Sequence, residues 1–228
     1  MLDSRRREAN MDPVRASVSL SRGRALVVAG ALLAGALVVS EPQAGGFETP
    51  PATTVSPVSP GRNPRWAVRM ERPGLRNFHR VSPTLYRGAQ PTQEGLAELR
   101  RLGVKTVVSL RAFHGEREMV AAAGLGYERI SFKVWHPEDE DLRRFLAIAT
   151  DPARQPVFLH CQRGADRTGT AVAVYRICVE GWSREDAIEE LANGGYAFEP
   201  RFGHLKRYLR SFKIEAVLPS NLTTPADR

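Results

Sequence analysis

Cysteine is scarce in this chain: its 228 residues include two, too few for the disulfide scaffold of a small secreted domain. The chain also has no Gly-X-Y period and no sustained heptad repeat, which excludes collagen-like and coiled-coil proteins. Only one long apolar run is present, so a multi-span membrane protein is excluded as well. The 42% of hydrophobic and 25% of charged residues are typical of a globular protein with a core.

Two further absences limit the ligands. The five histidines show no paired spacing of the kind that metal sites use, so we expect neither a metal nor another cofactor. The net charge of +8 is spread along the chain rather than gathered in a basic arm. We therefore expect no nucleic-acid partner, whereas a mildly basic surface suits a substrate with negative charge.

The single apolar run lies near the N-terminus, from Ala25 to Val39, and six arginines precede it. As a helix the run would rise about 22 Å, which is short of the ~30 Å hydrocarbon core of a bilayer. We therefore predict that residues 1–40 are a signal peptide, with an uncleaved anchor in contact with the membrane as the alternative. In either case the positive residues stay inside, so we expect the rest to be exported, as a secreted, periplasmic or membrane-anchored protein.

The residues that follow are rich in proline. Six prolines lie between residues 41 and 64 among Thr, Ser, Gly and Ala, a composition that cannot form a packed core. We predict a linker over residues 41–75, a folded domain over residues 76–214 and a tail over residues 215–228.

Apolar runs alternate with helical patterns in the predicted domain. The expected strands are Thr84–Arg87, Val104–Leu110, Tyr127–Val134 and Val157–Cys161. The expected helices are Thr92–Leu102, Glu116–Ala123, Glu138–Thr150, Arg167–Glu180, Ser183–Asn193 and Phe202–Ala216. This alternation predicts an α/β fold with a single parallel-type sheet flanked by helices, and ligands at the carboxyl ends of the strands.

The segment between the last predicted strand and the next helix carries reactive groups. A loop that leads into a helix presents unpaired N–H groups, which bind a phosphate-sized anion. The partial positive charge of these N–H groups also lowers the pKa of a cysteine such as Cys161, and the resulting thiolate is a nucleophile. Arg167 can take two oxygens of a phosphoryl group in a bidentate contact. Gly164 suits the positive φ of a tight loop, and Thr168 can donate its hydroxyl to the sulfur.

The pattern His-Cys-X5-Arg-Thr-Gly over residues 160–169 resembles the catalytic loop of cysteine-dependent tyrosine and dual-specificity phosphatases. A second segment, Asn77–Pro91, is similar to the opening of a compact bacterial, plant and fungal branch of that family. The resemblance implies a Cys161 nucleophile, a phosphocysteine intermediate and no metal. It further implies a phosphate site made of Gln162, Arg163, Gly164, Ala165, Asp166 and Arg167, with His160 and Thr168 in support.

The family also uses an acid on a movable loop to protonate the leaving oxygen. The candidate loop is Trp135–Asp141, which follows a predicted strand and contains four acids. We predict Asp139 as the acid, with Glu138 next and His136 as a further alternative. The same acids can instead serve the start of the following helix electrostatically.

Several other residues have two interpretations. Arg87 either supports the catalytic loop or is a solvated arginine at the end of a strand. Arg111 and Glu116 either shape the rim of the pocket or form a surface ion pair. Cys178 is expected to be a small core residue rather than a thiol that pairs with Cys161.

The residues of the loop indicate the substrate less clearly than they indicate the reaction. Arg163 and Asp166 nearly cancel inside the loop, so a phosphotyrosine or dual-specificity protein substrate, or another small phosphomonoester, is favoured over an inositol (pyro)phosphate. A rhodanese-like sulfurtransferase and an anchored phosphate-binding module without turnover are the alternatives of other classes.

Overall fold

The computed structural model describes residues 62–113, 115–220 and 222. The predicted signal or anchor segment, residues 1–40, and the predicted linker up to residue 61 lie outside the described residues. Within the described ranges, no helix has the length and apolar character needed to cross a membrane.

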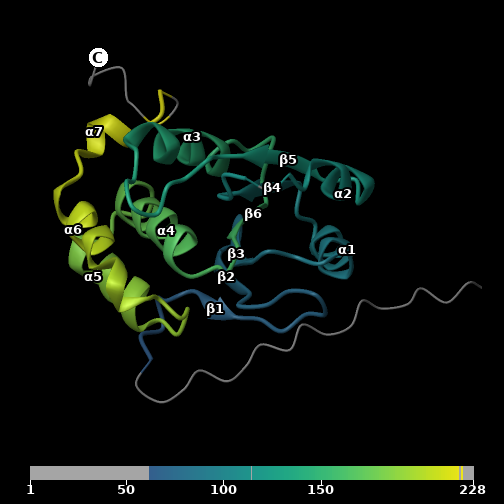
Figure 1. Cartoon of the computed structure of the whole chain (residues 1–228), viewed down its shortest axis with the longest axis horizontal. Helices are drawn as coiled ribbons and strands as arrows, with labels where there is room; N and C mark the ends of the chain where they lie inside the picture. Colours follow the sequence, from purple (N-terminus) through teal and green to yellow (C-terminus); the bar gives the residue numbers. More distant parts are fainter. Residues whose placement is uncertain (1–61, 114, 221, 223–228) are drawn as a thin grey trace, which may run out of the picture. The chain divides into compact units, whose positions relative to one another are not determined.

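The centre of the fold is a six-stranded sheet with the order β1-β2-β3-β6-β4-β5 (Figure 1). Its strands are β1 (Val68–Arg69), β2 (His79–Ser82), β3 (Leu85–Ala89), β4 (Thr106–Ser109), β5 (Gly126–Arg129) and β6 (Val157–Cys161). Strands β3, β6, β4 and β5 run parallel, as the alternating pattern predicts.

The prediction of a parallel-type sheet is wrong at the other edge. Strands β1 and β2 pair antiparallel, and β2 forms an antiparallel hairpin with β3, so the sheet is mixed. These two strands are only two and four residues long and alternate with exposed positions, so they contain no apolar run that could reveal them.

The helices lie close to the predicted positions. They are α1 (Gln93–Arg101), α2 (Arg117–Ala122), α3 (Asp139–Ala149), α4 (Asp166–Cys178), α5 (Arg184–Asn193), α6 (Gly203–Ser211) and α7 (Ile214–Val217), with a 3-10 turn at Pro200–Phe202. The predicted helix Phe202–Ala216 is instead divided into α6 and α7, because Phe212 and Lys213 have extended backbone angles.

Two layers of helices cover the sheet (Figure 1). One layer contains α1 and α2, and the other contains α3 to α7. Neighbouring residues of a strand point to opposite layers: Val107 and Phe158 pack with α1 and α2, while Val108 and Leu159 pack in the other cluster. Both sides of β4 and β6 are therefore buried, which explains their apolar runs, whereas the edge strand β5 is partly exposed.

The folded part extends beyond both predicted boundaries. Ala67, Met70 and Leu75 are buried and β1 belongs to the sheet, so the described end of the expected linker is part of the core. At the other end, α7 includes the buried Val217, which lies in the expected tail.

Candidate active site

The reactive loop lies at the carboxyl end of the central strand β6, between Cys161 and the start of α4 at Asp166. Its tight turn depends on Gly164, which has φ of +71°. A Cβ at this position would lie 2.4 Å from the carbonyl carbon and oxygen of Gly88 in β3. Only glycine fits there, because it alone combines this backbone angle with such a close approach.

The environment of Cys161 favours its ionised form. The side chain is buried, and burial alone raises the pKa of the thiol. The hydroxyl and backbone N–H of Thr168, the charge of Arg167 and the N–H of Gly164 act in the opposite direction. Together they hold the pKa of Cys161 below its usual value, which favours the thiolate, the nucleophilic form of cysteine.

Arg167 lies on the wall of a small cavity beside this loop. One of its guanidinium nitrogens donates to the backbone oxygen of Leu110 at 3.1 Å, which anchors the side chain at the end of β4. The cavity has a volume of about 210 Å³ and is lined by Arg111, Ala112, Phe113, Phe132, Val134, Trp135, Gln162 and Arg167. Gln162 and Arg167 are thus the two loop residues that face it.

The side chains of Arg163 and Asp166 bind a neighbouring segment. Arg163 donates to the carboxylate of Glu199 at 2.6 Å and to the carbonyl of Ala197 at 3.1 Å. The Asp166 carboxylate accepts from the Glu199 N–H at 2.9 Å. These two side chains therefore hold the outside of the loop, and they are not among the residues that line the cavity.

A buried chain of polar groups lies behind Cys161. The Nε2 atom of His160 lies 3.2 Å from a carboxylate oxygen of Glu116, and its Nδ1 atom lies 3.2 Å from the carbonyl oxygen of Cys161. The other oxygen of Glu116 pairs with Arg111 at 3.7 Å, and Arg111 donates to Gln90. Since the Glu116 side chain is only 3% exposed, this is not a surface ion pair.

Arg87 lies beneath the loop and is fully buried. It donates to the carbonyl oxygen of Gly164 at 2.8 Å, and its guanidinium carbon lies 3.8 Å from the centroid of the Tyr196 ring. The alternative of a solvated arginine is therefore wrong. Its buried cation is held against an aromatic face, where cation–π attraction is strongest.

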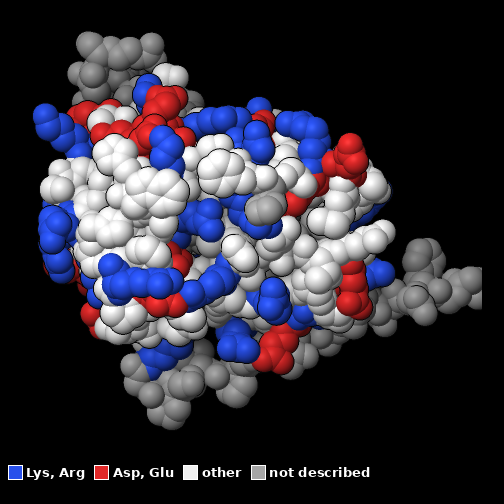
Figure 2. All heavy atoms as spheres, viewed as in Figure 1, with Lys and Arg blue, Asp and Glu red and all other residues white. Residues whose placement is uncertain are grey.

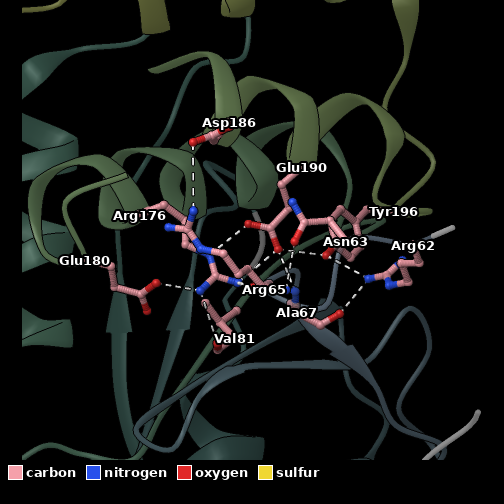
Figure 3. Close-up of polar contacts among 10 residues, drawn as sticks. All are labelled: Arg62, Asn63, Arg65, Ala67, Val81, Arg176, Glu180, Asp186, Glu190 and Tyr196. Carbon is pink, nitrogen blue, oxygen red and sulfur yellow. Dashed lines mark hydrogen bonds and ion pairs between the residues drawn. The ribbon is translucent and has the colours of Figure 1, made fainter. Parts of the chain in front are cut away.

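Figure 3 shows the polar network around Glu190, which joins Arg62 and Ala67 to Tyr196, the residue whose ring covers Arg87. The Glu190 carboxylate accepts from Tyr196 Oη at 3.0 Å and from the N–H of Ala67 at 2.7 Å, and it pairs with Arg176 at 2.8 Å. Arg62 donates to the carbonyl of Ala67 at 2.7 Å. Burial and Glu190 raise the pKa of Tyr196 to about 12, so the ring that covers Arg87 stays a neutral phenol.

Sequence reasoning missed both Glu190 and Tyr196. A signal for Glu190 exists, because it falls on the buried face of α5 with Ala187, Ile188 and Leu191. A glutamate among core positions of a helix implies a buried partner. No local pattern distinguishes Tyr196, which follows the end of that helix.

The structure does not bring the predicted acids to the cavity. Asp139 is the first residue of α3, and its carboxylate accepts from the hydroxyl of Tyr208 on α6 at 2.6 Å. Glu138 pairs with the exposed Lys133 at 2.7 Å, which lowers the pKa of Glu138. The loop contributes Trp135 to the cavity, beside the preceding Val134, and none of the four acids of the loop lines the cavity.

The two cysteines have different environments. Both are free thiols, and Cys178 is half-buried on α4, where it packs against the core. Burial raises the pKa of Cys178 to about 11, the opposite of the shift at Cys161. In the described part of the chain, no group of three or more His, Cys, Asp or Glu side chains could hold a metal ion.

The family described as "DSP-PTPase phosphatase fused to NAD+ Kinase" matches residues 75–199, which contain the catalytic loop and its supports. The chain belongs to the dual-specificity and tyrosine phosphatase family. This confirms the resemblance drawn from the Cys161 loop and the Asn77–Pro91 segment, and the chain is therefore an enzyme, a cysteine-dependent phosphatase.

Individual members of this phosphatase family agree with the assignment. The dual-specificity protein phosphatase TpbA of Pseudomonas aeruginosa is 34% identical over 157 residues, which cover 68% of this chain and 71% of that protein. A crystal structure of TpbA matches with a TM-score of 0.61 and covers 96% of that chain. A TpbA variant in complex with pTyr matches equally well at 33% identity over 95% of that chain. The PP-IP phosphatase SIW14 of S. cerevisiae shares the fold, with a TM-score of 0.54 at 23% identity, over 60% of this chain and 86% of that one.

Proposed function

We propose that this phosphatase hydrolyses phosphomonoesters through a phosphocysteine on Cys161, with phosphotyrosine in proteins as the favoured substrate. The observation that carries the proposal is the lowered pKa of a thiol at the base of a loop whose Arg167 faces the adjoining cavity. A nucleophile and a phosphate-binding cation at one site are the two groups that this chemistry requires.

The proposed reaction has two steps. The thiolate of Cys161 attacks phosphorus, the P–O bond to the leaving group breaks, and an acid gives that oxygen a proton. Water then attacks the phosphocysteine, the same acid, now a base, takes a proton from that water, and inorganic phosphate and the thiolate are released. Arg167 and the N–H groups of residues 162–167 hold the phosphoryl oxygens through both steps. They stabilise the negative charge on these oxygens in the transition states.

Asp139 remains the candidate acid of this proposal. In the described conformation its carboxylate is engaged by Tyr208, so the segment between Lys133 and Asp139 has to move before the carboxylate can reach a leaving oxygen. Trp135 and His136 of this segment are exposed, and none of its acids lines the cavity. Both observations support a segment that closes over a bound substrate.

Charge pairing supports a monophosphate over a polyphosphate substrate. Arg163 is neutralised by Glu199, and Arg111 shares a buried pair with Glu116, so neither offers an unpaired cation to a second phosphate. On the face drawn in Figure 2, basic side chains are scattered among acidic and uncharged ones and form no continuous basic surface. An inositol pyrophosphatase, the activity named for SIW14, is the second candidate.

A substrate panel tests the activity and the acid together. We expect the full chain to hydrolyse phosphotyrosine peptides and p-nitrophenyl phosphate, and to leave thiosulfate unchanged. An alkyl phosphate needs leaving-group protonation more than p-nitrophenyl phosphate does, so Asp139→Asn should lower the alkyl rate roughly 10²–10⁴-fold and the aryl rate far less. Sulfur transfer without phosphate release would contradict the function. Equal losses on both esters would contradict only Asp139.

A further inference from the structure

Two large apolar side chains are exposed beside the catalytic loop. Phe113 is 86% exposed and Trp135 is 68% exposed, and they are the large hydrophobic residues of the described chain that are exposed in this way. Both line the cavity that Arg167 and Gln162 also face. Apolar surface gathered at the mouth of a polar site marks a place where a partner group is bound.

The cavity has a polar part and an apolar part. Arg167 and Gln162 come from the phosphate-binding loop, whereas Phe132 and Val134 precede Trp135 in the chain and Ala112 precedes Phe113. A ligand that fits both parts has a compact anionic end and a flat apolar body. An aryl phosphate has this shape, with the phosphate on the loop and the ring between the aromatic side chains.

The aromatic residues come from separate segments. Phe113 follows β4, in the connection to α2, and Trp135 belongs to the connection between β5 and α3. Aromatic rings in two such connections can contact a third ring from two directions in offset or edge-to-face geometry. Neither residue is held in the buried core, so both have room to adjust to a ligand.

We propose that Phe113 and Trp135 form an aromatic clamp that selects aryl phosphates, phosphotyrosine above all, over alkyl and polyhydroxylated phosphates. The inference rests on the proposed phosphatase function and assigns its substrate specificity to these two residues. An inositol ring carries an oxygen on every carbon, and its burial against Phe113 and Trp135 would leave those oxygens unpaired. A phosphotyrosine ring buries apolar surface there at no such cost.

The test is the ratio of kcat/KM for phenyl phosphate to kcat/KM for β-glycerophosphate. We expect Phe113→Ala and Trp135→Ala each to lower this ratio roughly 5- to 10-fold, mainly through a higher KM for the aryl ester. Trp135→Phe should restore most of the loss, because it keeps a ring. Phe202→Ala is the matched control, since this partly exposed aromatic residue does not line the cavity.

Inhibition by orthovanadate serves as an internal reference, because this small anion reaches the loop and not the clamp. It should be unchanged in all variants. An unchanged ratio in both alanine variants would overturn the clamp, including the case in which both esters lose activity equally. A greater loss on β-glycerophosphate would instead assign Trp135 to the acid loop and also overturn it. If the unmodified protein hydrolyses neither ester, the phosphatase proposal itself fails, which is a distinct result.

Discussion

Two arginines of one loop have different surroundings, and from this difference we infer a catalytic role for Arg167 and a supporting role for Arg163. Arg167 is anchored on Leu110 and lines the cavity, whereas Arg163 is paired with Glu199 on the outer side of the loop. The phosphate site predicted from the family pattern included both. The spacing of the pattern gives no information about which side chain faces the ligand, because residues in a tight loop point in several directions.

The contrast predicts unequal effects of the same substitution. Arg167→Lys should lower kcat on p-nitrophenyl phosphate by about 10²–10³-fold, since an ammonium cannot make the bidentate contact to two phosphoryl oxygens. Arg163→Lys should change kcat less than about 3-fold, because it alters one partly exposed ion pair. Steady-state kinetics of the two variants measures this difference, and similar losses in both would contradict the assignment of roles.

At the scale of elements, the catalytic loop is held in place by the strand beside it. Strands β3 and β6 pair in register from Leu85 to Ala89, which brings Gly88 against the loop. Gly164 approaches Gly88 closely, and Arg87 from the same strand binds the carbonyl of Gly164. The segment Tyr86-Arg87-Gly88 is therefore a structural part of the active site.

From this packing we expect Gly164→Ala to lower both stability and activity. The new methyl group would meet backbone atoms of Gly88 that cannot rotate away, in addition to the cost of a positive φ. We expect a loss of roughly 2–4 kcal/mol in the free energy of unfolding, together with most of the activity. Urea unfolding and kinetics of the variant provide the measurement.

Gly181→Ala is the matched control. It also has a positive φ, of +67°, but open space surrounds its Cβ position. We expect a loss of about 1 kcal/mol with full activity. Equal destabilisation by the two substitutions would show that the contact with Gly88 contributes nothing.

The regular elements were largely predictable, and the exceptions have physical reasons. Strands β4 and β6 and the buried helix α4 have apolar runs because both of their sides are covered. Strands β1 and β2 contain charged and exposed residues rather than an apolar run, and the break at Phe212 contains neither glycine nor proline. Tertiary contacts fix these features, so local patterns do not contain them.

The same distinction applies to the site. Cys161, Arg167 and Gly164 follow one another in a loop with a local pattern, and the structure brings the first two to the same site. The Glu190–Tyr196 support of Arg87 joins residues about a hundred positions apart, and the exposure of Phe113 depends on how its connection folds. Neither could be predicted from spacing alone.

At the scale of the whole molecule, a buried neutral histidine links stability to pH. His79 lies in the core beside Tyr196, and burial together with the charge of Arg87 lowers the pKa of His79 to about 3. In the unfolded chain its pKa is near the usual value of about 6.5. Between these two values the unfolded state binds more protons than the folded state, so stability falls as pH falls.

We expect this single group to remove up to about 5 kcal/mol of unfolding free energy between pH 6.5 and pH 3. In His79→Gln, the dependence of unfolding free energy on pH between 4 and 6 should be less steep by close to one proton. His136→Gln, at an exposed histidine, is the control. Urea unfolding at several pH values gives both slopes, and identical slopes in the two variants would rule out a buried neutral His79.

In the proposed mechanism the Cys161 thiolate attacks phosphorus, and the phosphocysteine that this forms can be trapped. The protein is mixed with a ³²P-phosphotyrosyl peptide, quenched in acid within milliseconds, digested and mapped. We expect label on the peptide that contains Cys161, no label in Cys161→Ser, and unchanged labelling in Cys178→Ser. Phosphate release without label on Cys161, or turnover retained in Cys161→Ser, would contradict this mechanism.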